Sequence, residues 1–331
     1  MKDIFRAFVV DKQEDNFTAG VKSITMDDLP EGEVTIKVSY SSVNYKDGLA
    51  STPNGRIVSS YPFIPGIDLA GTVVASSDSR YKEGDKVLVT GYELGVSHYG
   101  GFSEYARVQA DWVVPLPDGL TVKEAMAYGT AGFTAALSVK RLEDHGIIPQ
   151  NGPVLVTGAT GGVGSMAVSM LAKKGYEVAA STGKESEHAY LQQLGASAIL
   201  SREEVSPEKI KTLDKPRWAA AVDPVGGRTL AYLLSSTKYG GAVAVSGMTG
   251  GGNVETTVFP FILRGISLFG IDSVYCPMEV RKRLWERMAD DLKPEGLVES
   301  IAHEISLDDL PRTLSAILEG KVRGRVVVAI D

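Results

Sequence analysis

The sequence predicts an α/β protein in which a doubly wound parallel sheet is inserted into a β-barrel-like domain. Three observations support this fold class. Short strand patterns separated by glycine and proline turns fill residues 3–115. Apolar strand patterns then alternate with helix patterns over residues 121–294, as in a parallel sheet covered on both faces. Strand patterns return in residues 297–331, so we expect both ends of the chain to build the first domain.

The length of 331 residues is sufficient for two domains, and 44% hydrophobic and 23% charged residues are typical of a globular protein. We predict a discontinuous first domain of residues 1–123 and 295–331. Residues 124–294 are predicted to form the inserted domain.

The composition argues against several classes of protein. A net charge of −7 does not favour a nucleic-acid surface. No stretch of about 18 apolar residues is present, so no membrane span is expected. Residues 1–15 contain early acids and only a short apolar run, unlike a signal peptide. Cys276 is the single cysteine, which excludes an internal disulfide and a cysteine-based zinc site and suits a reducing, cytoplasmic location.

In the first domain the strand patterns are rich in β-branched and aromatic residues and are separated by turns such as Pro30–Gly32 and Pro117–Gly119. The expected strands are Phe5–Val10, Val34–Tyr40, Val73–Ser76, Lys86–Thr90, Ser103–Val108 and Trp112–Pro115. The tail adds the strands Ile301–Leu307 and Val326–Ile330 and the helix Leu310–Glu319.

The inserted region starts with a helix, because Thr121 and Glu124 have the spacing of a capping box. A second helix is expected at Gly129–Arg141. The amphipathic helix Val280–Leu292 is basic and then acidic, and we interpret its charges as a solvated face. The other expected strands are Val154–Gly158, Glu177–Ser181, Ala198–Leu200, Trp218–Asp223, Ala242–Ser246 and Ser267–Ile271. The other expected helices are Ser165–Lys174, Ser186–Leu194 and Arg228–Ser235.

The clearest functional motif occupies residues 154–175, which read VLVTGATGGVGSMAVSMLAKKG. Strand, glycine turn and helix form the first unit of a Rossmann dinucleotide-binding fold, because unpaired N–H groups at the helix N-terminus bind a pyrophosphate. A Cβ at Gly161 would block that approach, and a Cβ at Gly164 would push the helix off the strand. The alternative is a tight turn that binds no ligand. The turn residues expected to bind the cofactor are Thr160, Gly161, Gly162 and Val163.

The end of the second strand of this fold indicates NADPH. An acid about 20 residues past the glycine turn usually binds the ribose 2′-OH of NAD. Here residues 179–184 read AASTGK, without an acid. Hydroxyl groups and positive charge favour an anionic 2′-phosphate, although ordinary surface charge is the alternative for the cations. The residues expected around this phosphate are Ser181, Thr182, Gly183, Lys184 and Arg202.

A β domain followed by this nucleotide domain resembles the medium-chain dehydrogenase/reductase superfamily over the whole chain. The resemblance implies a GroES-like β-barrel catalytic domain that carries the inserted Rossmann domain. Zinc alcohol dehydrogenases of the superfamily have a cysteine where this chain has Asn44, and a His-Glu pair where it has Ile67 and Asp68. The loop of residues 91–101 also lacks the four cysteines of their structural zinc site, so we expect no metal site.

Four segments make the chain more narrowly similar to the zinc-free quinone oxidoreductase branch, and within it to the acryloyl-CoA reductase-like group. They are Ser42–Asp47, Pro65–Gly71, Gly129–Thr134 and Pro260–Arg264.

The resemblance implies roles around the nicotinamide of the cofactor. It places Tyr45 in contact with the cofactor, and Asn44 and Asp47 beside the reacting groups. Thr130 is expected to bind the carboxamide or ribose, and Arg325 to hold a cofactor or substrate anion. Plain packing or a turn is the alternative for each residue. The residues expected to line the nicotinamide ring are Met248, Ile262 and Ser273.

The expected reaction is hydride transfer from NADPH to an activated C=C bond, as in acryloyl-CoA, a related enoyl thioester or an enone. The developing enolate needs hydrogen-bond donors, and its α-carbon takes a proton from Tyr45 or from water. Candidate cations for a CoA substrate are Arg56, Arg264 and Arg323.

Three alternatives remain for the function: an NADPH:quinone oxidoreductase, a non-catalytic NADPH-binding sensor, and a zinc-dependent alcohol dehydrogenase. The expected partners are a small-molecule substrate and a second copy of the chain. The strand Ser267–Ile271 can pair with its copy across a twofold axis, so a homodimer is expected.

Overall fold

The computed structural model describes residues 2–14 and 16–330; residues 1, 15 and 331 of the predicted first domain lie outside the described residues. The chain divides into two compact units. The β unit comprises Met1–Thr130, Val274–Ala289 and Gly296–Asp331. The α/β unit comprises Ala131–Ser273 and Asp290–Glu295. The domain boundaries predicted near residues 123 and 295 remain predictions.

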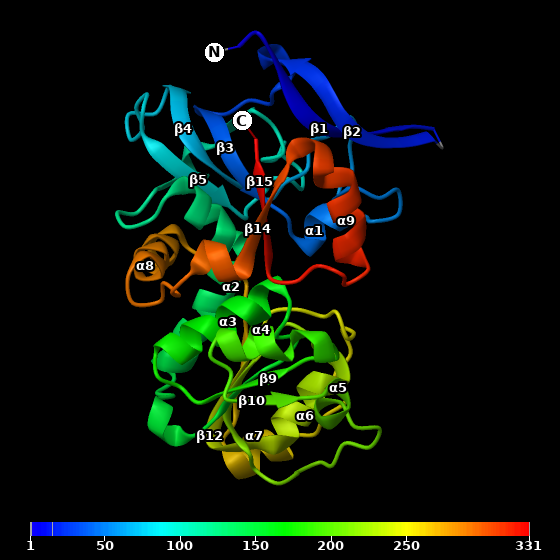
Figure 1. Cartoon of the computed structure of the whole chain (residues 1–331), viewed down its shortest axis with the longest axis vertical. Helices are drawn as coiled ribbons and strands as arrows, with labels where there is room; N and C mark the ends of the chain where they lie inside the picture. Colours follow the sequence, from blue (N-terminus) through cyan, green and yellow to red (C-terminus); the bar gives the residue numbers. More distant parts are fainter. Residues whose placement is uncertain (1, 15, 331) are drawn as a thin grey trace. The chain divides into compact units, whose positions relative to one another are not determined.

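The α/β unit is built on a six-stranded sheet whose strand pairs are all parallel (Figure 1). The order β10-β9-β8-β11-β12-β13 changes direction between β8 and β11, as in doubly wound sheets that bind nucleotides. The predicted strands are therefore confirmed. Their bounds are β8 (Val154–Val156), β9 (Val178–Ser181), β10 (Ala198–Leu200), β11 (Trp218–Asp223), β12 (Thr237–Val245) and β13 (Ser267–Gly270).

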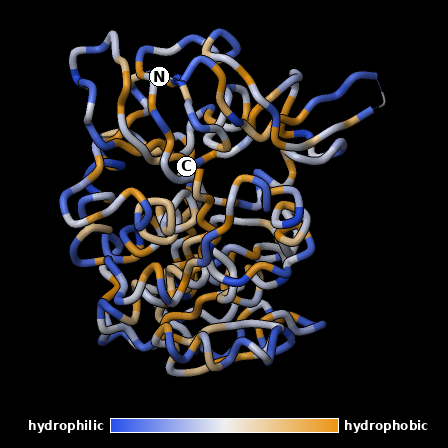
Figure 2. The backbone as a smooth tube through the Cα atoms, turned by 45° about the horizontal axis from the view of Figure 1, so that its top comes forward, coloured by the Kyte–Doolittle hydropathy of each residue, from blue (hydrophilic) through white to orange (hydrophobic). Residues whose placement is uncertain are grey.

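Apolar side chains of strands and helices fill the interior of the α/β unit. Leu155, Leu233 and Val243 are fully buried in one cluster, and hydrophobic stretches of the chain run through this interior in Figure 2. Sheet and helices thus bury their apolar faces against each other. The helices are α3 (Gly162–Lys173), α4 (His188–Gln193), α5 (Arg202–Val205), α6 (Gly227–Ser236) and α7 (Phe259–Arg264).

Helix α2 (Val122–Asp144) begins in the β unit and continues into the α/β unit. Its predicted capping box is present: the Thr121 N–H donates to Glu124 Oε2 at 2.8 Å, and the Glu124 N–H donates to Thr121 Oγ1 at 3.1 Å. Gly129, with φ 51° and ψ −158°, interrupts the helix. The two helices predicted in this segment are therefore two parts of α2, joined at Gly129.

The β unit contains a seven-stranded sheet, in which β14-β15-β3-β4-β5-β7 are neighbours and β6 pairs with β3. Strand β15 pairs antiparallel with β3, so the tail completes the sheet as predicted. Strands β1 and β2 form a separate hairpin (Figure 1). The bounds are β1 (Ile4–Gln13), β2 (Asn16–Thr25), β3 (Val34–Ser42), β4 (Asp68–Ser76), β5 (Lys86–Thr90), β6 (Tyr105–Val108), β7 (Val114–Pro115), β14 (Ala302–Ser306) and β15 (Arg325–Ala329).

Two elements of the β unit were not predicted from the sequence. Strand β2 pairs only with β1, and none of its residues is fully buried, so its pattern lacks a continuous apolar face. Helix α1 (Tyr45–Ala50) is six residues long. It packs against α9 (Leu310–Leu318) through Gly48, where an added Cβ would lie 2.9 Å from Leu318 Cγ. These contacts come from the tail and leave no local pattern.

In helix α8 (Met278–Ala289) the interpretation that all charges lie on a solvated face is wrong. Its charges were expected on a solvated face, but Arg281 is 0% exposed. Arg281 Nη1 donates to the carbonyl oxygen of Thr90 at 2.8 Å, Nη2 donates to that of Val274 at 3.0 Å, and the guanidinium lies 4.7 Å from the ring centroid of Tyr92. Carbonyl and aromatic partners thus compensate for the burial of this charge.

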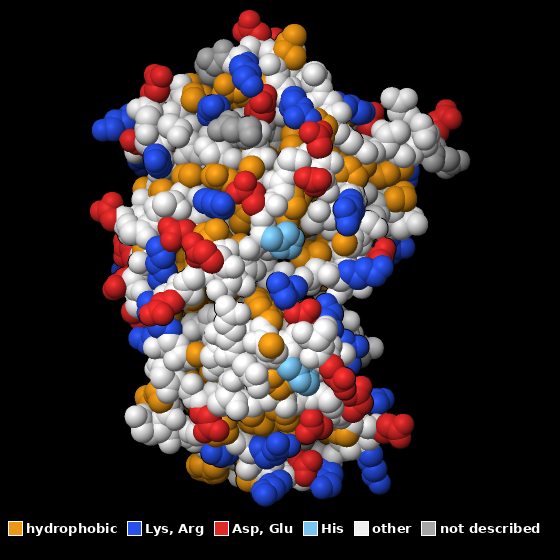
Figure 3. Space-filling model, viewed as in Figure 1, with side chains coloured by type: hydrophobic (Ala, Val, Ile, Leu, Met, Phe, Trp, Pro, Cys, Tyr) orange, Lys and Arg blue, Asp and Glu red, His pale blue; other side chains and the backbone are white. Residues whose placement is uncertain are grey.

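Among residues 2–14 and 16–330, no helix is long and apolar enough to cross a membrane. Cationic and anionic side chains are interspersed over the face drawn in Figure 3.

Candidate active site

The glycine turn of the α/β unit connects β8 to α3 and shows why two glycines are needed. An added Cβ at Gly164 would lie 2.6 Å from the Cα of Ala159, so the helix could not pack on the turn. An added Cβ at Gly161 would meet only the carbonyl oxygen of Gly158, at 3.4 Å. The surface at Gly161 is therefore open to a ligand, and the first N–H groups of α3 have no partner within the helix.

The residues predicted around a 2′-phosphate lie together at the end of β9. Ser181 and Thr182 are buried, and the Ala159 N–H of the glycine turn donates to the carbonyl oxygen of Ser181 at 3.0 Å. The guanidinium of Arg202 lies over Gly183, where an added Cβ would be 3.2 Å from Nε. The structure thus brings the corner at the end of β9 next to both the glycine turn and Arg202.

Lys184 follows this corner directly. Its backbone N–H donates to Thr182 Oγ1 at 3.1 Å, which orients the threonine hydroxyl. The Ser181 hydroxyl donates to the carbonyl oxygen of Ser201, at 3.4 Å. Both hydroxyl groups are therefore held by the backbone around the predicted phosphate position.

Polar residues at the ends of β8 and β11 were not singled out in the sequence analysis. Thr157 Oγ1 donates to Asp223 Oδ1 at 2.5 Å, and the N–H groups of Val225 and Gly226 also donate to this carboxylate. Burial raises the pKa of Asp223. The acid directly after the apolar run of residues 218–222 is the signal that could have identified this carboxylate.

The residues predicted at the nicotinamide ring differ in exposure. Met248 and Ile262 are 73% and 69% exposed, which is unusual for apolar side chains of this size. Ser273 is half-buried and its hydroxyl lies 2.9 Å from Thr134 Oγ1. The hydroxyl oxygen of Ser246, just before Met248, is buried and has no hydrogen-bond partner among the described residues. A buried hydroxyl without a partner is a feature that a polar ligand would satisfy.

In the β unit, helix α1 positions the three predicted catalytic residues differently. Tyr45, its first residue, is 47% exposed. Asn44 and Asp47 are 8% and 0% exposed. Asp47 accepts hydrogen bonds from the N–H groups of Asn44 at 2.8 Å and Ile67 at 2.9 Å. Of the three predicted catalytic residues, Tyr45 is thus the one whose side chain is exposed.

Asp68, at the start of β4, is the centre of a buried polar network. Its carboxylate accepts hydrogen bonds from Ser42 Oγ at 2.6 Å and from Asn44 Nδ2 at 2.7 Å. It also accepts from Thr130 through the N–H at 2.9 Å and Oγ1 at 2.6 Å. The backbone N–H and the hydroxyl of Thr130 thus both donate to Asp68. The position of the Asp68 carboxylate requires glycine at residue 129, because an added Cβ there would lie 2.5 Å from Asp68 Oδ2.

Arg325, which was expected to hold a cofactor or substrate anion, is buried among protein partners. It is 2% exposed and donates from Nε to the carbonyl oxygen of Ala127 at 3.1 Å and from Nη1 to that of Val43 at 3.0 Å. Its Nη2 donates to Ser42 Oγ at 2.9 Å and lies 3.8 Å from Asp68 Oδ2. Arg325 is therefore engaged inside the β unit, where it balances the charge of Asp68.

The buried network shifts the pKa of two of its members. Burial, and after it the charge of Asp68, raise the pKa of Asp47, while the N–H groups of Asn44 and Ile67 lower it; the outcome is a pKa of about 7. Burial lowers the pKa of Arg325, while Asp68 and then Asp47 raise it. A protonated Asp47 would leave one carboxylate and one guanidinium in the network, which is the balanced state.

The described part of the chain holds no group of three or more His, Cys, Asp and Glu side chains that could bind a metal ion. At the positions compared with zinc ligands, Asn44 donates to Asp68, and Ile67 is buried.

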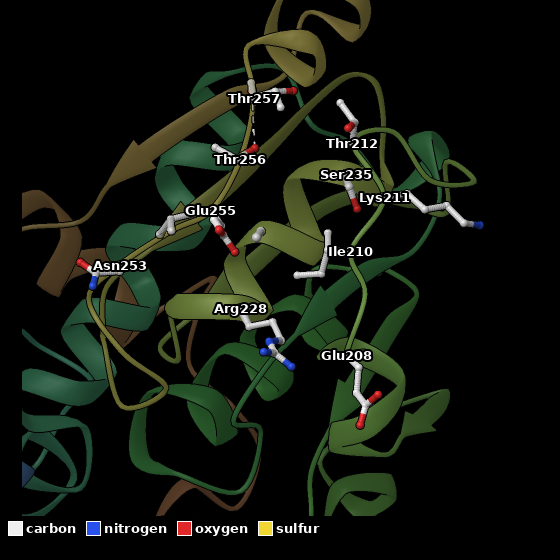
Figure 4. Close-up of a pocket in the computed structure, with 12 residues that line it drawn as sticks. Glu208, Ile210, Lys211, Thr212, Arg228, Ser235, Asn253, Glu255, Thr256 and Thr257 are labelled. Atoms are coloured by element: carbon white, nitrogen blue, oxygen red, sulfur yellow. Dashed lines mark hydrogen bonds between the residues drawn. The ribbon is translucent and has the colours of Figure 1, made fainter.

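A separate pocket of about 650 Å³ lies in the α/β unit, between residues 208–212, helix α6 and residues 253–257 (Figure 4). Its lining mixes charges of both signs, Glu208 and Glu255 with Lys211 and Arg228. None of the predicted site residues lines it.

Comparison with known families supports this description. Residues 30–118 match the alcohol dehydrogenase GroES-like domain, and residues 162–290 match the family described as zinc-binding dehydrogenase. YhfP of Bacillus subtilis, provisionally named a quinone oxidoreductase, is 58% identical over 330 residues, with 100% of both chains covered. Acrylyl-CoA reductase AcuI of Ruegeria pomeroyi is 53% identical over 330 residues, 99% of this chain and 100% of AcuI.

Solved structures agree with the sequence matches. YhfP with NAD bound has a TM-score of 0.97 and covers 99% of this chain and 100% of its own. The YhdH oxidoreductase of Salmonella enterica in complex with NADP has a TM-score of 0.96 at 49% identity, covering 98% of this chain and 100% of its own. These likenesses confirm the predicted fold of a Rossmann sheet inserted into a GroES-like domain. The chain belongs to the medium-chain dehydrogenase/reductases, in the zinc-free group that includes quinone oxidoreductases and acrylyl-CoA reductases.

Proposed function

We propose that the protein is an NADPH-dependent reductase that transfers hydride to the activated C=C bond of acryloyl-CoA or a related enoyl thioester or enone. The observation that carries the proposal is the acid-free corner Ser181–Lys184, with Arg202 over Gly183 and the glycine turn hydrogen-bonded to Ser181. The 53% identity to AcuI, named an acrylyl-CoA reductase, supports the choice of acceptor.

The donor set of the α/β unit fits a dinucleotide phosphate. Residues Thr160 to Val163 are proposed to hold the pyrophosphate, because the surface at Gly161 is open and the α3 N-terminus offers N–H groups. Bound NADPH supplies the hydride. The exposed side chains of Met248 and Ile262, with Ser273, are proposed to lie against the nicotinamide, where a ligand would cover their apolar surface.

Relatives of this chain have been solved with NAD or with NADP bound. YhfP was solved with NAD and the Salmonella enterica protein with NADP. We favour NADPH because a 2′-phosphate would find the guanidinium of Arg202 and the charge of Lys184, while a 2′-OH would find no carboxylate at the end of β9.

Tyr45 is proposed as the residue of α1 that touches the reacting groups, since 47% of its surface is exposed. Hydride addition to the β-carbon leaves an enolate, and its α-carbon takes a proton from the Tyr45 hydroxyl or from water. Asn44 and Asp47 are buried, so we propose that they position Tyr45 rather than contact the substrate. Thr130 and Arg325 receive the same positioning role, through Asp68.

Reduction of a quinone is the second candidate function. The 58% identity to YhfP, provisionally named a quinone oxidoreductase, favours it. A quinone accepts hydride without a phosphate-bearing carrier, so the two candidates need different surroundings for the same hydride donor.

We also propose a homodimer formed through β13, which is an edge strand of its sheet. Leu268 of β13 is more than one third exposed, and so are Val258, Phe259 and Leu263 in the segment that precedes β13 in the chain. Pairing of two edges would satisfy unpaired backbone groups and cover these side chains. A cytoplasmic location and domain boundaries near residues 123 and 295 complete the proposal.

The test is NADPH oxidation with acryloyl-CoA, crotonyl-CoA, a simple enone and a benzoquinone. The proposal expects the highest kcat/KM with a thioester or enone. A higher value with benzoquinone would support the second candidate. Tight NADPH binding without turnover of any acceptor would indicate a sensor and contradict both.

A further inference from the structure

Arg56 is the one charged residue in the segment of residues 48–67, which follows the start of α1. Residues 48–67, between the buried Asp47 and Asp68, contain no other charged side chain. Arg56 is exposed, and its side chain forms no hydrogen bond or ion pair with any described residue. An exposed arginine with no acid nearby in sequence leaves its charge available to a ligand, whereas most surface cations have acidic neighbours.

The backbone holds Arg56 in a defined place. The Ser51 N–H donates to the carbonyl oxygen of Asp47 at 3.1 Å, and the Thr52 N–H donates to that of Leu49 at 3.1 Å. An added Cβ at Gly55 would overlap the Leu49 carbonyl oxygen, so the loop is folded back onto the end of α1. Arg56 itself has φ 56°, a left-handed conformation that costs a non-glycine residue on the order of 1 kcal/mol. Such strain is often found where a side chain serves a ligand.

Arg56 and Tyr45, the residue proposed to touch the reacting groups, are connected through helix α1. Tyr45 begins α1, and six helical residues advance about 9 Å along the axis. The Arg56 loop is fastened to the other end of the same helix. Between them Lys46, which is half-buried, has no hydrogen-bond or ion-pair partner among the described residues. Its neighbour Asp47 is buried, so the accessible charges of this segment are positive.

The other two candidate cations are already engaged. Arg264 Nη1 donates to the carbonyl oxygen of Ser235 at 2.7 Å, and Nη2 donates to that of Asp214 at 2.5 Å. Arg323 also has an interaction of its own within the protein, and it lies near His303, whose pKa is lowered first by burial and then by the charge of Arg323.

We propose that Arg56, assisted by Lys46, binds the phosphate-bearing carrier of an acyl thioester substrate while the acyl group lies at Tyr45. This inference rests on the proposed function and deepens it. Arginine binds phosphate through paired, charge-assisted hydrogen bonds. A neutral quinone or enone has no phosphate to bind at this site. Arg56 would therefore make the enzyme prefer a carrier-bound thioester to those acceptors.

The experiment compares two thioesters of the same acyl group: acryloyl-CoA and the acryloyl thioester of N-acetylcysteamine, which lacks phosphate. The variant Arg56→Asn removes the charge and tolerates the left-handed backbone. It is expected to raise KM for acryloyl-CoA about tenfold, as the loss of a charge-assisted contact does, with kcat nearly unchanged. KM for the truncated thioester should not change, and Arg56→Lys should recover part of the loss.

Arg283→Gln is the matched control, because Arg283 is an exposed arginine of the same unit with Glu279 and Glu286 on its helix. It should leave both KM values unchanged. An Arg56→Asn enzyme with unchanged KM for acryloyl-CoA, or with equal increases for both thioesters, would overturn the inference.

Failure of the proposed function is recognised separately, as no turnover of either thioester by the wild type. In that case the binding of coenzyme A alone is measured by calorimetry with NADPH present. Weaker binding to Arg56→Asn than to the wild type would still support the phosphate site. Equal binding, or no binding to either protein, would overturn it.

Discussion

The side chain of Asn44 donates from Nδ2 to the carboxylate of Asp68 at 2.7 Å, and both residues are at most 8% exposed. This contact joins the start of α1 to the start of β4. Because Asp68 also binds Thr130 and faces Arg325, one carboxylate connects four segments that are distant in sequence. Helix α1, which carries Tyr45, is thus held by a buried polar network rather than by apolar packing alone.

Replacing the central carboxylate should therefore be costly. Asp68→Ala leaves the buried Arg325 without its negative partner, and breaking a buried pair in this way typically costs about 3–5 kcal/mol. Chemical unfolding should show a loss of this size, and Asp68→Asn, which keeps an acceptor for Asn44, a smaller loss. If Asp68→Ala unfolds within about 1 kcal/mol of the wild type, the network does not stabilise the β unit as described.

Asp47 should give the stability a measurable pH dependence. Its pKa of about 7 in the folded protein lies above the ordinary value of 3.8. The folded state therefore binds more protons between these values, and this group lowers the free energy of unfolding as pH rises from about 4 to 7, by up to about 1.4 kcal/mol per pH unit. Below pH 4 its destabilising effect should be absent.

The contribution of Asp47 is isolated by comparing wild type with Asp47→Asn, since other carboxylates titrate in both proteins. Urea unfolding at several pH values should give a difference in stability that changes between pH 4 and 7, with the wild type losing stability relative to the variant. A difference that is constant over this range would contradict the raised pKa.

Cofactor choice should depend on the cations at the end of β9. The double variant Lys184→Ala, Arg202→Ala is expected to raise KM for NADPH by about tenfold or more, because two charges near the 2′-phosphate are lost. KM for NADH should change little, since NADH has no such phosphate. Steady-state kinetics with both cofactors measure these KM values. Equal increases in KM for NADPH and NADH would instead indicate that residues 181–184 no longer fold correctly.

Tyr45→Phe tests the proton donor. If the hydroxyl supplies the proton, kcat should fall by about 10²-fold or more, while NADPH binding stays normal because the ring is kept. Turnover with acryloyl-CoA and fluorescence titration with NADPH provide the two readouts. A variant that binds NADPH normally and retains full turnover would show that water, or another group, donates the proton.

The oligomeric state depends on the edge strand β13. Leu268→Lys places a charge on an apolar side chain of that edge, and we expect the dimer to dissociate. Light scattering after size-exclusion chromatography should report a dimer for the wild type and a monomer for the variant, with unchanged circular dichroism. A monomeric wild type would contradict the proposed dimer.

The elements that the sequence predicts well are those whose signals are local. The apolar strand Trp218–Asp223 and the capping box of Thr121 and Glu124 follow from neighbouring residues and appear in the structure as expected. The glycine turn is recognisable for the same reason.

Long-range contacts explain what could not be predicted. The burial of Arg325 and Arg281 is not predictable from neighbouring residues, because the carbonyl groups that accept from them come from segments far away in the chain. Strand β2 and helix α1 depend on pairing with β1 and packing on α9, so neither has a strong pattern of its own. That the Ser246 hydroxyl is buried without a hydrogen-bond partner among the described residues depends on its surroundings, so the sequence gives no sign of it.

Gly161 and Gly164 of the β8–α3 turn are needed for different reasons, ligand binding and folding. Even a Cβ at Gly164 would collide with the backbone of Ala159, so any descendant of this protein that keeps this turn must keep that glycine. A side chain at Gly161 has room, and only a bound ligand would forbid it. A lineage that had stopped using a dinucleotide could therefore lose Gly161 while retaining Gly164, and the first substitution to look for in an inactive descendant is at position 161.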